Sequence, residues 1–256
     1  MCGATLLTAW FASVALTAGA PGATTGRVSA SAPCPTGKYS ARTSLVGYSA
    51  RHRPIIATEV GAPHASKSVL IIGSISGDEP GGIAVASALA TCRTIPGVDL
   101  WLLPDMNPDG LGARTRVNAN GVDLNRNFPF SWRPLGPKGS RNYAGPRPLS
   151  EPESASVAAL IRRIRPTVGV WFHQPYGLID DSQGPQTFEH SLALLANLPE
   201  AKLPDFPGSA IGWEDHLFRN SAFDVELPGA LSLTAIARDA QALYTVASTL
   251  TPRRGG

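Results

Sequence analysis

The chain has 256 residues, of which 43% are hydrophobic and 16% are charged, and its formal net charge is +3. This length and composition fit one sizeable globular domain with a hydrophobic core. The small net charge and the scattered basic residues argue against a partner such as nucleic acid or an anionic membrane surface.

The first 20 residues have the features of a secretory signal peptide. An apolar stretch from Leu6 to Leu16 is followed by small residues that form an A-x-A cleavage site over residues 18–20. The stretch is too short to cross a bilayer, which takes about 20 apolar residues. We therefore expect a signal peptide over residues 1–20, a secreted protein, and no stable membrane association after cleavage.

The chain contains three cysteines. Cys2 would be removed with the signal peptide, which leaves Cys34 and Cys92. In an exported protein these two residues are free to form one disulfide, and we predict that bond. Two unrelated buried thiols are the alternative that the sequence leaves open. Residues 21–43 are expected to be a Pro/Gly/Ser-rich lead-in to the main domain.

Strands and helices alternate in the main domain, which we expect over residues 44–256. Short apolar runs predict buried strands, and longer segments with apolar residues at helical spacing predict helices. The expected strands are residues 53–61, 68–75, 98–104, 167–172 and 221–228, and the expected helices are residues 81–92, 150–165 and 232–249. This alternation predicts the α/β class: a single domain with a mixed, mostly parallel β-sheet covered by helices on both faces.

One helix start is marked clearly by the segment "SEPE". Ser150 is expected to be the N-cap and Glu153 to complete a capping box, with Pro152 in the first turn. The stretch before it, residues 105–149, is dense in Asn, Pro, Gly and Arg and is expected to be irregular.

Polar residues occur at or just after the ends of four expected strands, namely Glu79, Asn107, His173 and Glu226. Binding sites of such sheets lie beyond the carboxyl ends of the strands, so we expect these side chains to meet at one edge. A catalytic zinc site uses three ligands from His, Asp, Glu or Cys and leaves a fourth position for water. Taken singly, each of these residues could equally be a satisfied core histidine, a solvated acid or a polar loop residue.

Three further side chains in the irregular stretch are suited to binding anions. Arg116, Asn125 and Arg126 carry planar donor groups that can hold a carboxylate or a developing oxyanion. The alternative is a polar loop that is held together by its own Asn and Asp side chains.

Several short motifs occur together and in a characteristic order: "GDE", "NPDG", "GVDLNRNFP", "YAGPRPLSEPE", "HQP" and "VELP". In these motifs the chain resembles the zinc metallocarboxypeptidases of the carboxypeptidase A-like superfamily, particularly the compact bacterial branch related to murein-peptide amidases. The resemblance covers about residues 44–250 and implies a carboxypeptidase-like fold.

The resemblance also implies metal-assisted hydrolysis with one zinc ion per chain. Glu79 and His173 would be two of the three zinc ligands, and Glu226 would be the general base that activates the zinc-bound water. Arg116 would polarise the scissile carbonyl, with Arg114 as a competitor for this role.

Substrate binding follows from the same resemblance. Asn125 and Arg126, together with Arg116, would bind the terminal carboxylate of the substrate. The tyrosine that covers the substrate in digestive carboxypeptidases has no evident counterpart before Glu226.

One ligand position departs from the family pattern. Ser76 stands three residues before Glu79, where the family has its first zinc-binding histidine. Serine is not among the usual zinc ligands, so we expect zinc binding to be weakened or lost and activity to be impaired. Rescue by His64 or Asp78 is a minor alternative.

The resulting hypothesis is a secreted, monomeric zinc carboxypeptidase that hydrolyses the C-terminal bond of a peptide or a peptidoglycan-derived peptide and is impaired by Ser76. Two alternatives stay open. One is a non-catalytic protein that binds the carboxylates of peptide C-termini, and the other is a zinc-dependent amino-acid deacylase.

Overall fold

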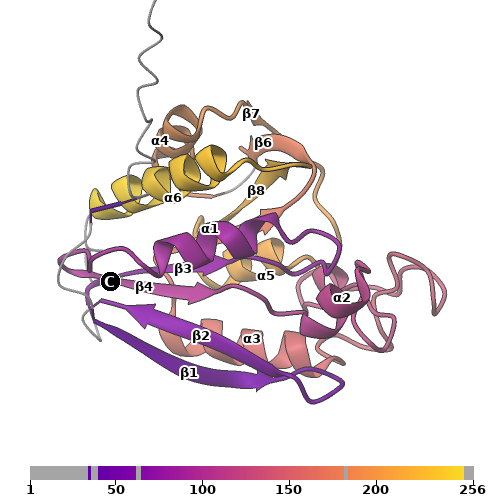
Figure 1. Cartoon of the computed structure of the whole chain (residues 1–256). Coiled ribbons are helices and arrows are strands. Elements are labelled where there is room, and N and C mark those ends of the chain that lie inside the picture. The colour runs from indigo at the N-terminus through magenta and orange to yellow at the C-terminus, as the bar shows by residue number, and fades with distance from the viewer. Residues whose placement is uncertain (1–33, 36–39, 62–64, 182–183, 251–256) are drawn as a thin grey trace, which may run out of the picture. The chain divides into compact units, whose positions relative to one another are not determined.

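The computed structural model describes residues 34–35, 40–61, 65–181 and 184–250 (Figure 1). The expected signal peptide and His64 lie outside these described residues, as does most of the lead-in. The first strand begins at Ala41, slightly before the expected domain boundary at residue 44. None of the helices in the described segments is both long enough and apolar enough to cross a membrane.

A mixed sheet of eight strands, in the order β1-β2-β4-β3-β5-β8-β6-β7, forms the centre of the described part of the chain. Its strands are β1 (Ala41–Tyr48), β2 (Pro54–Val60), β3 (Lys67–Ile72), β4 (Val98–Leu103), β5 (Val168–His173), β6 (Tyr176–Asp180), β7 (Glu200–Ala201) and β8 (Ala222–Pro228). The central strands β4, β3, β5 and β8 are parallel to one another, whereas β1, β2 and β6 each pair antiparallel with a neighbour. The carboxyl ends of the four central strands therefore lie at one edge.

Helices cover both faces of this sheet (Figure 1). They are α1 (Gly81–Leu89), α2 (Pro108–Ala113), the 3-10 helix η1 (Leu124–Arg126), α3 (Pro152–Ile164), α4 (Gln186–Ala196), α5 (Ala210–Leu217) and α6 (Leu233–Ser248). Helices α1, α4 and α6 lie on one face, and α3 and α5 lie on the other. Successive residues of a strand point to opposite faces, so Phe172 joins the first core and Trp171 the second. The predicted fold class is confirmed.

All of the expected strands and helices are present, but the sequence missed several elements. Strands β1, β6 and β7 and helices α4 and α5 were not predicted, and α2 and η1 lie in a stretch that was expected to be irregular. No residue of strand β1 is fully buried, which explains its weak apolar pattern.

The capping box predicted at the start of α3 is wrong. Glu151, in an extended conformation, is the N-cap, and the Ser150 hydroxyl donates to its Oε1 at 2.7 Å. The carboxylate of Glu153 accepts from the backbone N–H of Ala50 at 2.9 Å and from the Asn118 amide at 3.1 Å. Glu153 therefore links α3 to distant loops.

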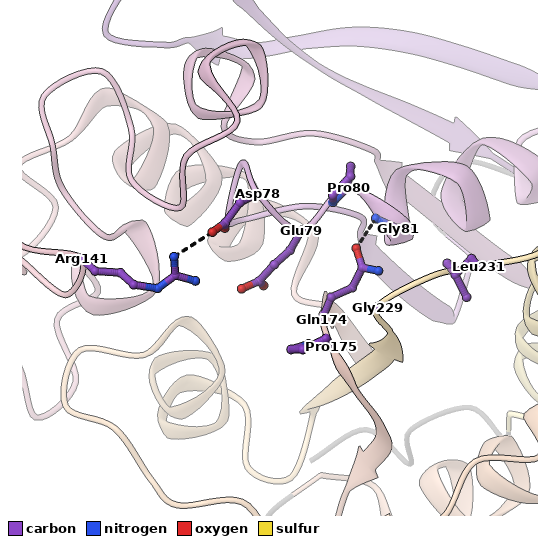
Figure 2. Close-up of a pocket in the computed structure, with 9 residues that line it drawn as sticks. All are labelled: Asp78, Glu79, Pro80, Gly81, Arg141, Gln174, Pro175, Gly229 and Leu231. Carbon is purple, nitrogen blue, oxygen red and sulfur yellow. Dashed lines mark hydrogen bonds and ion pairs between the residues drawn. The ribbon is translucent and has the colours of Figure 1, made fainter.

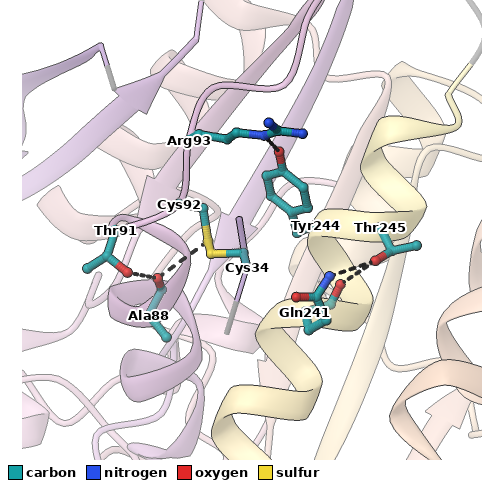
Figure 3. Close-up of a disulfide and its surroundings, with 8 residues drawn as sticks. All are labelled: Cys34, Ala88, Thr91, Cys92, Arg93, Gln241, Tyr244 and Thr245. Atoms are coloured by element: carbon teal, nitrogen blue, oxygen red, sulfur yellow. Dashed lines mark hydrogen bonds between the residues drawn. A yellow bond between two sulfur atoms is a disulfide. The ribbon is translucent and has the colours of Figure 1, made fainter. Parts of the chain in front are cut away.

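The structure contains a disulfide between Cys34 and Cys92 (Figure 3). Both cysteines are buried, and Cys92 lies just beyond the end of α1. Next to it, Nε of Arg93 donates to the Tyr244 hydroxyl of α6 at 3.2 Å. The disulfide thus links Cys34, which precedes the first strand, to the segment that follows helix α1.

Candidate active site

The expected site residues gather in one pocket at the carboxyl edge of the central strands. Glu79 follows β3, His173 ends β5, and Glu226 lies opposite His173 in the register of β5 and β8. A pocket of about 630 Å³ is lined by all three and by Arg116 and Arg126. The parallel sheet places these residues together because its strands end at the same edge.

Asn107 does not belong to this pocket, although it follows β4 as expected. Its side chain is buried, its amide donates to the carbonyls of Ile75 and Arg116 at 3.2 Å each, and its Oδ1 caps α2 through Gly110. Asn107 therefore supports the loop that carries Arg116.

Charged side chains that line the pocket contact one another in a chain. Nδ1 of His173 lies 2.9 Å from Oε2 of Glu79, and Nη1 of Arg116 donates to the other Glu79 oxygen at 2.8 Å. Nε of Arg116 in turn donates to Asp123 at 2.9 Å. Arg114 is exposed and lies at the C-cap of α2, so Arg116 is the arginine of this loop that faces the pocket.

The neighbouring charges shift the pKa values of this chain of residues. Burial lowers the pKa of His173, but the charge of Asp224 and the bond to Glu79 outweigh burial and raise it to about 9. Burial raises the pKa of Glu79, yet the bond and charge of His173 and the charge of Arg116 outweigh it, and the pKa is lowered. The contacts therefore favour an ionised carboxylate beside a cationic imidazole.

The side chains of Asn125 and Arg126, which are expected to bind a carboxylate, lie on η1. Oδ1 of Asn125 accepts from the backbone N–H of Ala210 at 2.9 Å, which fixes the orientation of the amide. The Arg126 guanidinium stacks on the Phe206 ring, 4.2 Å from its centre. Burial lowers the pKa of Arg126 from its usual high value, and a buried guanidinium that lines a pocket is suited to holding an anion.

Glu226 also lines the pocket, next to His173 in the register of β5 and β8. The backbone N–H of Tyr176 approaches its Oε2 at 3.5 Å, and burial raises the pKa of the carboxyl group. A carboxyl group with a raised pKa at a pocket wall is suited to exchanging a proton with a bound molecule.

Sequence reasoning missed several residues of this pocket, among them Asp224 and Tyr176. The side chain of Asp224 lies with Oδ1 3.3 Å from Nε2 of His173, and the Tyr176 ring is 67% exposed at the rim. Asp224 precedes Glu226 by two residues in a strand, so both side chains point to the same face. This alternation was the signal available in the sequence.

A second, shallower pocket of about 440 Å³ adjoins the first across Glu79 (Figure 2). Oε1 of Gln174 accepts from the backbone N–H of Gly81 at 2.8 Å, and Arg141 forms an ion pair with Asp78 at 2.9 Å. One oxygen of the Asp78 carboxylate is thus paired with Arg141, and the other is buried without a hydrogen-bond partner.

The residues present do not fit a three-ligand zinc centre. Ser76 is 1% exposed, and its hydroxyl oxygen has no hydrogen-bond partner. Across the described residues, no group of three or more His, Cys, Asp or Glu side chains is placed to hold a metal ion. Glu79 and His173 provide two donors of the usual kinds, and Ser76 does not provide the third.

Comparison with known proteins defines the family. The zinc carboxypeptidase family model matches residues 36–179. Murein peptide amidase A of Escherichia coli (strain K12) is 34% identical over 170 residues, which cover 59% of this chain and 68% of that protein. The chain therefore belongs to the zinc carboxypeptidase family, whose members are metallopeptidase hydrolases.

Solved structures agree with this assignment. The murein-tripeptide amidase of Escherichia coli O157 is 27% identical with a TM-score of 0.64, and the match covers 82% of this chain and 93% of that one. Carboxypeptidase A of Helicoverpa armigera has the same fold, with a TM-score of 0.67 at 18% identity over 81% of this chain and 68% of that one.

Proposed function

We propose that this pocket recognises the free carboxy-terminus of a peptide, and that Ser76 impairs the hydrolysis for which the family fold is built. One observation carries the proposal. Asn125 and Arg126 line the pocket with donor groups that could bind a carboxylate, whereas Ser76, at the position expected to hold a zinc ligand, has a buried hydroxyl without a hydrogen-bond partner. Arg126 and Asn125 would hold the carboxylate, and Arg116 would contact the carbonyl of the terminal bond.

The proposed substrate is a peptide of bacterial cell-wall origin. Support comes from two relatives described as a murein peptide amidase and a murein-tripeptide amidase. An extracellular substrate also fits the signal-peptide features of residues 1–20 and the Cys34–Cys92 disulfide, which is typical of exported proteins. The proposed protein is secreted. It is also proposed to be monomeric and to bind zinc weakly or not at all.

The test compares the parent chain with Ser76→His and with Ser76→Ala as the matched control. Zinc per chain is measured after dialysis, together with the release of terminal residues from peptides with free carboxy-termini. We expect Ser76→His to hold about one zinc ion and to release the terminal residue, because imidazole is a usual zinc ligand. The parent and Ser76→Ala should do neither. Zinc-loaded Ser76→His that cleaves no peptide would contradict the peptidase proposal.

Two alternatives are separated by the same set of proteins. A deacylase would act on N-acyl amino acids and ignore peptides. A pure binding protein would retain ligands with a free carboxylate but cleave nothing even when zinc is bound. The oriented Asn125–Arg126 pair is common to all three functions, so only the reaction products distinguish them.

A further inference from the structure

A further cavity lies at the opposite end of the central strands from the active-site pocket. It has a volume of about 460 Å³, and its lining includes Ser68 and Asp99, which occur near the amino ends of β3 and β4. Glu79 follows the carboxyl end of β3, so the length of that strand separates this amino-edge cavity from the active-site pocket. The volume is within the usual range for small-molecule sites, about 300–1,000 Å³.

The strand register places polar side chains in a row along the cavity. Arg42 of β1 lies opposite Glu59 of β2, and Glu59 lies opposite Trp101 of β4. Residues directly opposite each other in antiparallel strands point to the same face, with Cβ atoms about 4.5–5.5 Å apart. Asp99 precedes Trp101 by two residues and therefore shares this face. It is the face that α3 covers, because Ala57, two residues before Glu59, belongs to the same core as α3.

Glu59 supplies the indication that a ligand belongs here. It is 7% exposed and lines the cavity, and within the part of the chain that the structure describes its carboxylate has no hydrogen bond or ion pair. Buried carboxylates in native proteins are normally paired, because removing a charge from water is costly. A cationic donor in the cavity would meet this requirement. Asp99 is 5% exposed and lines the same cavity, so its negative charge would add to the attraction.

Two arginines line the same cavity nearer to solvent. Arg42 and Arg163 are both exposed, and the Arg163 guanidinium lies over the Trp101 ring, 5.5 Å from its centre. Among the described residues, neither arginine forms an ion pair with Glu59. The cavity therefore combines buried negative charge with positive charge close to solvent, and Trp101 adds an apolar surface.

We propose that the amino-edge cavity binds a small zwitterion, namely a free α-amino acid with an apolar side chain. Its ammonium group, which has three donors, is held by Glu59 and Asp99. Its carboxylate is held by Arg42 and Arg163, since guanidinium groups bind carboxylates through paired hydrogen bonds. The side chain packs on Trp101. Two carboxylates and two guanidinium groups balance each other, so a ligand with both charges matches the cavity better than a simple cation or anion.

The test follows leucine binding to the full chain by NMR, through the indole N–H signal of Trp101, which a Trp101→Phe variant assigns. This signal reports the amino-edge cavity, since none of the described residues that line the active-site pocket is a tryptophan. Leucine is compared with leucinamide, which lacks the carboxylate, and with N-acetyl-leucine, which lacks the ammonium, at about pH 6, where free amino groups are charged. We expect leucine to shift the signal at millimolar concentration. Each derivative should need at least about 10-fold more, because it loses a charge-assisted contact.

Three results of this comparison would overturn the inference. Absence of a shift by leucine at millimolar concentration removes the site. An equal response to leucinamide shows that the arginines do not hold a carboxylate. An equal response to N-acetyl-leucine shows that Glu59 does not hold an ammonium group. All three results are obtained on the parent chain, and none of them bears on the proposed recognition of peptide carboxy-termini at Arg126.

Substitutions then assign the contacts. Glu59→Gln keeps the shape of the side chain and should weaken leucine binding by at least about 10-fold. The double variant Arg42→Gln with Arg163→Gln should weaken leucine by at least about 5-fold and leave leucinamide within about 2-fold, because the amide has no carboxylate to lose. Arg126→Gln, which changes the active-site pocket, is the control and should leave the leucine response unchanged. A leucine response that survives Glu59→Gln would overturn the assignment.

Discussion

Nδ1 of His173 lies 2.9 Å from Oε2 of Glu79, and the other oxygen of Glu79 accepts from Arg116 at 2.8 Å. The two side chains that the family would use to hold zinc thus satisfy each other, within a buried group of alternating charges. This arrangement stabilises the pocket without an ion, and it makes the pair part of the fold as well as of the site.

Glu79→Gln is expected to destabilise the protein. Removing one partner of a buried ion pair costs roughly 3–5 kcal/mol, but Asp123 and Asp224 still compensate Arg116 and His173, so we expect about 2 kcal/mol. Urea unfolding followed by circular dichroism measures the change. The control is Asp78→Asn, which breaks the exposed pair with Arg141 and should cost no more than about 1 kcal/mol. Equal costs for both variants would contradict this interpretation.

Gly77→Ala is expected to disrupt the turn that carries Ser76 and Glu79. A Cβ atom at residue 77 would overlap the backbone of Gly110 and Leu111, and backbone cannot move aside as a side chain can. Overpacking of this kind typically costs about 1–3 kcal/mol, and we expect the upper part of that range.

Gly112→Ala in the neighbouring helix α2 is the matched control, because its added Cβ would meet only the end of the long Arg53 side chain, which can shift at the cost of its bond to the Pro108 carbonyl. Alanine also favours a helix over glycine by about 1 kcal/mol, so this variant should be neutral or slightly more stable. Thermal unfolding of the two variants would show a large difference in Tm. A Gly77→Ala protein as stable as the parent would show that the turn tolerates a side chain.

Removing the disulfide should lower stability substantially. The bond joins residues 58 positions apart, and closing a loop of that size in the unfolded chain corresponds to about 4 kcal/mol. We expect the double variant Cys34→Ala with Cys92→Ala to lose this amount in urea unfolding. A reducing agent should lower the stability of the parent to nearly that of the variant and leave the variant unchanged. An effect of reduction on the variant would indicate another cause.

Glu214 should make stability fall as pH rises. Burial raises the pKa of this carboxyl to about 8, although the Trp171 indole donates to it at 2.8 Å. Between its ordinary pKa of 4.5 and about 8 the native state holds a proton that the unfolded state has released. The free energy of unfolding therefore decreases through this window, by on the order of 1 kcal/mol per pH unit at most.

The measurement for this residue is the pH dependence of urea unfolding from pH 5 to pH 8. Glu214→Gln keeps an acceptor for Trp171 and cannot ionise, so its stability relative to the parent should rise with pH. A constant difference across this range would show that Glu214 does not titrate between the two states.

Much of the site could be predicted because its residues follow recognisable strands. Glu79, His173 and Glu226 occur at the ends of apolar runs, and the parallel arrangement of β3, β5 and β8 follows from the alternation of strands and helices. Arg116, Asn125 and Arg126 were singled out by their planar donor groups, and the family motifs then suggested their roles. The same argument from strand ends gave a wrong expectation for Asn107. Its position after a strand does not reveal that its amide donates to the carbonyls of Ile75 and Arg116.

The sequence by itself determined the fold class and the family, and it predicted that Ser76 stands where a zinc ligand was expected, because these depend on local apolar patterns and short motifs. Only the tertiary structure decided what lies around those motifs. A cavity of about 40 Å³ brings Asn125 together with Asp215 and Asp224, residues about 90 to 100 positions further along the chain. Such contacts are set by how helices and loops pack on the sheet, and no local pattern encodes them. The same holds for the Ser76 hydroxyl, since the sequence reveals the substitution but only the packed structure reveals that the oxygen is buried without a partner.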